Sequence, residues 1–317
     1  MTYVSNYPSW WPYISSNIFV SYWGVAAGVV VVYDWVLTLR QEIELIWRQR
    51  WSLMTVLYLT IRYIGIPFSV INLLPIMPSV SLTDAVSTIT YYTESVINLV
   101  VTAMLGVIMI ARLYAMYHGS RKMLIFLVII FLAVIITCGV ILAIDLEYSV
   151  WEEFVLSGTY ICYYVDGDGA NHQISYSTVW ILYTVWEVLA LCFSIWIAVK
   201  HFCDLRRLGA STGSTIGDCF RVLIQSHVLY FASFVGVSCL QLTELSPEIA
   251  NLNSIGAQIL YGAVQILLVV QMFVLGPRLI LSVREYNAKL VAYSDAETSM
   301  HSIVFHERVH VSTSSTV

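Results

Sequence analysis

Two opposite charges lie inside separate apolar stretches of the sequence, Asp34 in the first and Arg62 in the second. An unpaired charge at the centre of a bilayer costs about 2.5 to 3.5 kcal/mol on insertion scales, so such charges usually turn inward and pair. We therefore expect an ion pair between Asp34 and Arg62. Thr38 and Glu42 follow Asp34 at four-residue steps and can supply further acceptors. The pair serves either as a static clamp or as a switch that breaks on activation.

A second set of polar residues lies in the later apolar stretches: Glu94, Asn98, Glu187 and Gln265. The first two are four residues apart and share one helical face. Because helices bury polar side chains away from lipid, we expect all four to face one another across a bundle and to line a pocket for a small ligand. The alternative is a structural role, in which the same groups form interhelical hydrogen bonds that hold the bundle together.

The residues needed for catalysis or for cofactor attachment are missing from the apolar stretches. A zinc hydrolase needs several His residues with Asp, and His227 is the only His in such a stretch. The six cysteines show no close zinc or redox spacing. The last stretch has no Lys that could hold retinal as a Schiff base. We expect no enzyme activity, no cofactor, no metal site and no nucleic-acid partner.

Membrane helices must position these residues, because the composition excludes a water-soluble fold. The 317-residue chain is 59% hydrophobic and only 11% charged, and its mean hydropathy is +0.78. A soluble domain of this size needs a mostly polar surface. Seven apolar runs are each long enough to cross about 30 Å of hydrocarbon as a helix. We predict an all-α membrane protein, a seven-transmembrane helix bundle with spans at residues 18–39, 53–74, 96–117, 123–144, 178–199, 222–242 and 255–275.

The basic residues give the bundle a direction, because Lys and Arg near membrane spans gather on the cytosolic side. Of the 15 Lys and Arg residues, all except Arg62 fall in alternate loops, at the helix ends beside them, or in the tail. The opposite side carries only acidic residues, among them Asp84, Asp145 and Glu244. We predict that the N terminus lies outside and the C terminus in the cytosol, with the plasma membrane as the host. An acidic outer face favours cationic partners.

The chain divides into three parts. We expect residues 1–17 to form an outer N-terminal segment, residues 18–275 the helix bundle, and residues 276–317 a cytosolic part. The stretch PRLILSVREYNAKLVAY has apolar residues on one side and basic residues on the other, which predicts an amphipathic helix on the inner leaflet before a disordered tail. In one outer loop, alternating residues on both sides of an Asp-Gly turn at residues 166–168 predict a β-hairpin.

The first two predicted spans carry an ordered set of residues that are unusual in an apolar context. They are Tyr33, Asp34, Leu37, Thr38, Glu42, Ile46 and Trp47, the basic pair Arg48 and Arg50 around Gln49, and then Arg62 and Tyr63. With them, residues 18–74 resemble the signature region of a family of fungal, mainly basidiomycete, multi-span membrane proteins of unknown function. The resemblance implies a membrane protein with seven spans, and it implies no particular activity.

Seven spans with an outer N terminus are also the topology of G-protein-coupled receptors, although topology alone does not decide function. Arg112 lacks the acidic neighbour that rhodopsin-like receptors have at the inner end of the third span. We predict a receptor-like or sensory protein that lies in the lipid bilayer, binds a small-molecule ligand from the outer side and signals to a cytosolic partner. The alternatives are a transporter or channel, for which no internal repeat is found, and then a membrane scaffold without a ligand.

Overall fold

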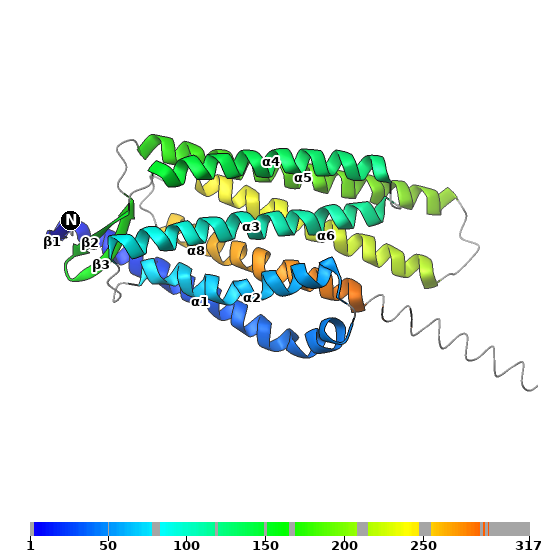
Figure 1. Ribbon diagram of the computed structural model, residues 1–317, viewed down its shortest axis with the longest axis horizontal. Helices are drawn as coiled ribbons and strands as arrows, with labels where there is room; N and C mark the ends of the chain where they lie inside the picture. Colours follow the sequence, from blue (N-terminus) through cyan, green and yellow to red (C-terminus); the bar gives the residue numbers. More distant parts are fainter. Residues whose placement is uncertain are drawn as a thin grey trace, which may run out of the picture.

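The computed structural model describes residues 3–49, 51–77, 83–117, 120–148, 151–164, 169–207, 215–246, 255–285, 288 and 291. Within these residues, seven long helices form a bundle and a small sheet lies at one end of it (Figure 1). The helices are α1 Trp11–Glu42, α2 Leu53–Leu73, α3 Asp84–Met116, α4 Arg121–Tyr148, α5 Gly169–Arg207, α6 Thr215–Glu244 and α8 Ile255–Val270.

The helices are apolar enough to lie in a membrane. Six of them are long and apolar enough to cross it, and Val228–Glu244 of α6 is a shorter apolar helix. Helix α4 exposes a row of large apolar side chains, including Ile125, Ile129 and Ile136, as is expected of a helix that faces lipid. The prediction of a helical, multi-span membrane protein in a lipid bilayer is confirmed. Its direction across the membrane stays a prediction.

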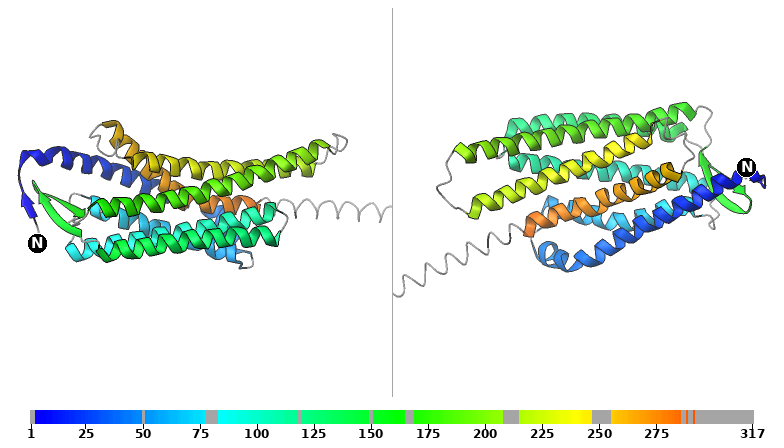
Figure 2. Two further views of the ribbon diagram at one scale, coloured as in Figure 1. Left: turned by 90° about the horizontal axis from the view of Figure 1, so that it is seen from above. Right: turned by 180° about the vertical axis from the view of Figure 1, so that it is seen from behind.

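The helices follow one another around a ring, which α8 closes by packing between α6 and α1 (Figure 2). Small residues allow close contact within the ring. A Cβ atom added to Gly262 of α8 would lie 2.3 Å from Cγ of Trp23 on α1, and one added to Gly106 of α3 would lie 2.2 Å from the ring of Phe131 on α4. Glycine at these positions lets a large aromatic ring lie directly against the neighbouring backbone.

Helix α8 continues beyond its predicted end. It passes through a π-helical turn, η4 (Gln271–Leu275), and stays helical to Glu285. The predicted boundary at Leu275 is therefore wrong, because Leu279, Ile280 and Leu281 are buried in the bundle core instead of lying on a membrane surface. The amphipathic pattern reflects packing against protein over residues 276–285. The rest of the predicted cytosolic part, apart from residues 288 and 291, lies outside the described residues.

The sheet has three strands, β1 (Tyr3–Ser5), β2 (Trp151–Leu156) and β3 (Thr159–Tyr164). Strand β2 pairs in parallel with β1 and antiparallel with β3. The hairpin turn is Ser157–Gly158, where both residues have positive φ, as a type I′ turn requires. The predicted hairpin is therefore misplaced along the sequence. Strand β3 pairs with β2, which precedes it, and the chain after residue 168 forms helix α5, which begins at Gly169, instead of the predicted second strand. Residues 166–168 themselves lie outside the described part.

The N-terminal segment and the β2–β3 hairpin thus meet at one end of the bundle, which we call the sheet end. The opposite end, where α1 finishes and α4 begins, carries Arg40, Arg48, Arg121 and Lys122, and we call it the basic end. Helix α3 begins at Asp84 instead of at the predicted Val96, so it extends toward the sheet end with polar residues. This extension contributes part of the site described next.

Candidate functional site

A cavity of about 560 Å³ lies between α2, α3, α4, α5, α6 and α8. Its wall includes residues near the sheet-side ends of four of these helices, namely Tyr91, Asp145, Ser175 and Glu244. The cavity therefore occupies the half of the bundle that is nearest the sheet end. Its volume falls within the range of about 300 to 1,000 Å³ that is usual for pockets that bind small molecules.

Among the described residues, the charged ones in the cavity wall are all acidic: Glu94 on α3, Asp145 on α4 and Glu244 on α6. Nδ2 of Asn72 donates a hydrogen bond to Oε1 of Glu94 over 3.1 Å. The hydroxyl of Tyr91 donates to Oδ2 of Asp145 over 2.8 Å. Both donors are uncharged, so they stabilise the carboxylates without neutralising them.

Amide and aromatic groups complete the wall. The side-chain oxygens of Gln241 and Gln265 are buried and accept no hydrogen bond from any residue in the described part of the chain. Trp180 lies between Tyr176 and Tyr183, with ring centroids 6.2 and 6.3 Å away in edge-to-face arrangements. The wall therefore offers flat apolar surfaces together with polar groups that can still accept a hydrogen bond.

The structure brings together three of the four residues that were predicted to form a pocket. Glu94, Asn98 and Gln265 line the cavity, and Glu187 does not. Glu187 lies deeper, beside a separate space of about 30 Å³, where Ser238 and Gln271 donate hydrogen bonds to its two carboxylate oxygens. The predicted group of four is corrected accordingly: Glu187 belongs to a polar contact that joins α5, α6 and η4.

A packed apolar layer lies between the cavity and the basic end. Leu113 of α3, Ala190 of α5 and Phe231 of α6 are buried there in one apolar cluster, further from the sheet end than the residues of the cavity wall on the same helices. Interiors of this kind have few voids larger than a water molecule. The layer therefore forms the floor of the cavity.

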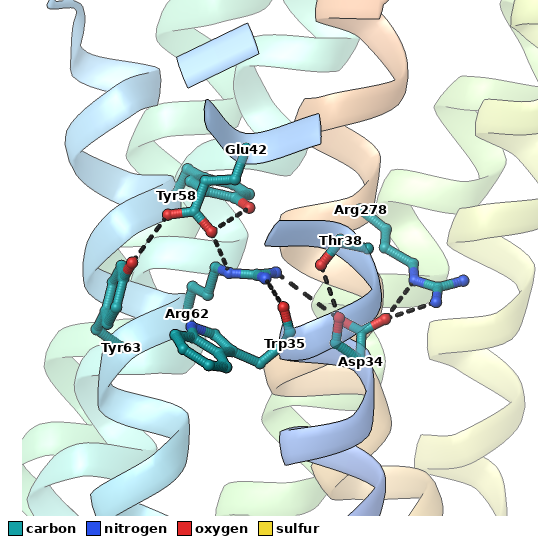
Figure 3. Close-up of polar contacts among 8 residues, drawn as sticks. All are labelled: Asp34, Trp35, Thr38, Glu42, Tyr58, Arg62, Tyr63 and Arg278. Carbon is teal, nitrogen blue, oxygen red and sulfur yellow. Dashed lines mark hydrogen bonds and ion pairs between the residues drawn. The ribbon is translucent and has the colours of Figure 1, made fainter. Parts of the chain in front are cut away.

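Toward the basic end, four charged residues form a network in which Asp34, Glu42 and Arg62 are buried and Arg278 is half exposed (Figure 3). Nε of Arg62 on α2 lies 2.6 Å from Oε2 of Glu42 on α1, at an angle suited to an ion pair and not to a hydrogen bond. Nη1 of Arg62 lies 3.8 Å from Oδ2 of Asp34, and its Nη2 donates to the carbonyl oxygen of Trp35 over 2.8 Å. Nε of Arg278 donates to Oδ1 of Asp34 over 2.6 Å.

Hydroxyl and indole groups supply further donors to Glu42. The hydroxyl of Tyr63 donates to Oε1 over 3.0 Å, and that of Tyr58 to Oε2 over 3.4 Å. Nε1 of Trp47 donates to Oε1 over 3.1 Å from the π-helical turn η2 (Ile43–Trp47). Glu42 is fully buried, and these contacts replace the water that its carboxylate would otherwise bind.

Helical spacing explains how the network is assembled. Asp34, Thr38 and Glu42 recur every four residues along one face of α1, and Tyr58 and Arg62 do the same on α2. The predicted Asp34–Arg62 pair is found at 3.8 Å, but the closer partner of Arg62 is Glu42 and the closer partner of Asp34 is Arg278. Two carboxylates and two guanidinium groups leave the network without net charge.

Sequence reasoning did not place Arg278 in the site, because it lies beyond the predicted end of the last span. Two further arginines join helix 255–285 to its neighbours at the same level. Nη2 of Arg112 on α3 donates to the carbonyl oxygen of Leu279 over 3.1 Å. Arg284 donates to the carbonyl oxygen of Leu45 over 2.9 Å and to Oγ1 of Thr55 over 2.6 Å.

Residues 22–67 match a family of unknown function (DUF6533). The predicted resemblance to such a family in the first two helices is confirmed, and the fungal origin stays a prediction. No curated protein matches the chain. Among the residues that the structure describes, no group of three or more His, Cys, Asp or Glu side chains could hold a metal ion.

The matched segment is the part of the chain that builds most of the buried network. It contains Asp34, Glu42 and Arg62, and also the residues whose backbone or side chain completes their contacts, namely Trp35, Thr38, Trp47, Tyr58 and Tyr63. Only Arg278 comes from outside it. Four of the residues that carried the resemblance, Asp34, Glu42, Arg62 and Tyr63, therefore share a physical role, which is to bind α1 to α2 through polar contacts.

Proposed function

We propose that this membrane protein is a receptor-like or sensory seven-helix protein that binds a small ligand in the cavity near the sheet end. Occupation of the cavity shifts helix 255–285, which carries the change to the basic end. The sheet end is the outer side in this proposal and the basic end faces a cytosolic signalling partner, in keeping with the distribution of Lys and Arg.

The observation that carries the proposal is the path of helix 255–285. Tyr261, Gln265 and Met272 on this helix line the cavity. The same helix then passes through the π-helical turn η4 and reaches Arg278, whose guanidinium pairs with Asp34. Single π-helical turns inside α-helices are frequent at functional sites. One continuous helix thus connects the cavity wall with the charge network, and a local irregularity lies between them.

The packed floor favours a binding protein over a channel or transporter. A channel needs a wet path between its two ends, and a transporter needs access to its site from each side in turn. Leu113 and Phe231 lie buried in the layer between the cavity and the basic end. A cavity with a closed floor suits a ligand that enters and leaves at one end.

The proposal is tested by a library of small molecules, with a cavity-filled variant as the control. Asn98 lines the cavity and is replaced in the Asn98→Trp variant, which fills part of the space. Both proteins are reconstituted in lipid nanodiscs, and their unfolding temperatures are measured with each compound. A compound that binds in the cavity raises the unfolding temperature of the native chain and leaves that of the variant unchanged, because only the folded, unfilled protein binds it.

Two outcomes contradict the proposal. The first is that no compound stabilises the native chain more than it stabilises the Asn98→Trp variant. The second is that the variant unfolds at a higher temperature than the native chain and keeps every response to compounds, which would make the cavity a packing defect and not a binding site.

A further inference from the structure

We propose that the ligand of the cavity is a small organic cation with an apolar body, such as a protonated amine. This inference rests on the proposed ligand-binding function and adds the chemical class of the ligand. Three independent features of the cavity wall carry it: the sign of its charges, its unpaired hydrogen-bond acceptors and its aromatic surfaces.

The charges of the wall are one-sided. Glu94, Asp145 and Glu244 come from three different helices, and the residues that the structure describes add no Lys, Arg or His to the wall. Of the described basic side chains, Arg62 is already paired in the buried network, and Arg40, Arg48, Arg121 and Lys122 lie at the basic end. Acidic walls of low dielectric constant concentrate cations and repel anions. An anionic ligand would enter against this field.

The unpaired groups of the wall point to the same chemistry. Gln241 is only 4% exposed, and its side-chain oxygen accepts no hydrogen bond within the described part of the chain. The side-chain oxygen of Gln265, on the neighbouring helix α8, is likewise buried and accepts no hydrogen bond from the described residues. Buried acceptors without a partner are unfavourable, and a ligand removes the cost if it brings N–H donors. An ammonium group brings three donors and no acceptor, whereas a carboxylate or phosphate brings only acceptors.

The aromatic residues account for the rest of the ligand. Tyr176, Trp180 and Tyr183 succeed one another along α5 and line the cavity. Their rings offer apolar area for the body of a ligand, and their faces attract a cation through the ring quadrupole. Leu142, Val179 and Leu268 add purely apolar surface. A small inorganic cation would leave most of this surface and of the 560 Å³ unused.

A cysteine in the cavity measures the preference for charge directly. In the Asn98→Cys variant of the full chain, held in nanodiscs, the reaction rate is measured with trimethylammonioethyl methanethiosulfonate and with sulfonatoethyl methanethiosulfonate. The parent chain gives the background from the native cysteines. For each variant, the rate with the cationic reagent is divided by the rate with the anionic reagent. This ratio is then divided by the ratio that the same two reagents give with the free thiol 2-mercaptoethanol. Thr102→Cys, in the same wall, serves as a second reporter if Asn98→Cys does not fold.

We expect a corrected preference of about tenfold for the cation, which corresponds to about 1.4 kcal/mol. The preference should fall several-fold when Glu94→Gln or Glu244→Gln is added. The control is Asn6→Cys, the same substitution at an exposed position of the sheet end, where we expect a ratio close to that of the free thiol.

The other outcomes separate the two proposals. Equal corrected rates, faster reaction of the anionic reagent, or an equal preference at Asn6→Cys would overturn the cationic ligand and leave the ligand-binding function standing. Failure of both reagents to reach either cavity cysteine would overturn the proposed function itself, because a ligand of similar size could not enter.

Discussion

The guanidinium of Arg278 meets Oδ1 of Asp34 at 2.6 Å and so joins the helix that ends the described bundle to the helix that begins it. Because α8 packs beside α1, this pair closes the ring of helices near the basic end. Asp34 is buried, while the side chain of Arg278 is 51% exposed. The contact is therefore partly hydrated, and it can open at lower cost than the fully buried contacts of Arg62.

Removing single arginines should rank the contacts of the network. We expect Arg62→Gln to lower the free energy of unfolding by about 3 to 5 kcal/mol, since Glu42 and Asp34 would lose a buried partner. Arg278→Gln should cost about 1 kcal/mol, because its side chain is half exposed and its pair is screened by water. Unfolding by titration with dodecyl sulfate in mixed micelles gives these values. Arg40→Gln is the control, because its side chain is 90% exposed and pairs with Glu44 four residues further along the chain. It should change stability by less than about 0.5 kcal/mol. A larger loss for Arg278→Gln than for Arg62→Gln contradicts the ranking.

A double-mutant cycle should locate the main partner of Arg62. We expect a coupling free energy of about 1 to 3 kcal/mol between Glu42→Gln and Arg62→Gln, whose charged atoms lie 2.6 Å apart in the native protein. The coupling between Asp34→Asn and Arg62→Gln should be smaller, since the atoms are 3.8 Å apart and Asp34 keeps Arg278. The same unfolding measurement serves both cycles. If the losses in the Glu42–Arg62 cycle simply add, the two residues are not coupled and the network has been misassigned.

Two alanine substitutions at helical glycines should have opposite effects. Gly262→Ala places a methyl group 2.3 Å from Cγ of Trp23, so the contact between α1 and α8 must open, and we expect a loss of about 1 to 3 kcal/mol. Gly236→Ala meets no atom within 4 Å and should be neutral or stabilising by up to about 1 kcal/mol, because alanine favours the helix. Unfolding temperatures in nanodiscs compare the two variants. Addition of Trp23→Leu should restore part of the loss at Gly262, and equal stabilities of the two glycine variants would refute close packing of α1 on α8.

The direction of the chain across the membrane is tested with two peptide tags. One tag is inserted in the turn between Ser157 and Gly158 at the sheet end, and the other follows the C terminus. Because Lys and Arg gather at the basic end, we expect an impermeant protease to remove the first tag from sealed cells and to spare the second. Permeabilised cells, in which both tags are cut, provide the control. Cleavage of the C-terminal tag alone in sealed cells would mean that the orientation is the reverse of the predicted one. Cleavage of both tags in sealed cells would mean that the two tags lie on the same side of the membrane.

The helices could be predicted from the sequence because each apolar run must satisfy its backbone hydrogen bonds within lipid. The lengths of the helices could not be predicted from the sequence, as α3 illustrates. Hydropathy detects only the apolar part of a helix, and the backbone hydrogen bonds of α3 continue through the polar stretch from Asp84 to Ser95. The hairpin was misplaced because the sequence contains two competing turn signals. Ser157–Gly158 is a two-residue signal of the kind that favours hairpins, and the Asp-Gly sequence at residues 166–168 is a stronger signal of the same kind.

The site was partly predictable for the same physical reason. Charges inside apolar runs must turn inward, so Asp34 and Arg62 could be singled out and paired from sequence alone. Arg278 could not, because only the folded chain brings α8 beside α1. Glu187 was grouped with the cavity residues because sequence gives the face of a helix more reliably than its depth. Tyr183 lines the cavity, and Glu187 lies one helical turn, about 6 Å, further along α5.

The central claim is that a ligand in the cavity shifts the other end of helix 255–285, at the basic end of the bundle. Hydrogen–deuterium exchange of residues 276–285 tests it most directly, in the Asn98→Cys chain before and after trimethylammonioethyl methanethiosulfonate has filled the cavity. Asn6→Cys, modified by the same reagent at the sheet end, is the control, and the treated parent chain accounts for the native cysteines, including Cys138 in the cavity wall. We predict that exchange of these amides changes severalfold on modification at residue 98 and stays constant on modification at residue 6, because the helix shifts against its contacts with Asp34, Arg112 and Leu45. Protection that changes only around the cavity, with residues 276–285 unaltered, would contradict the claim.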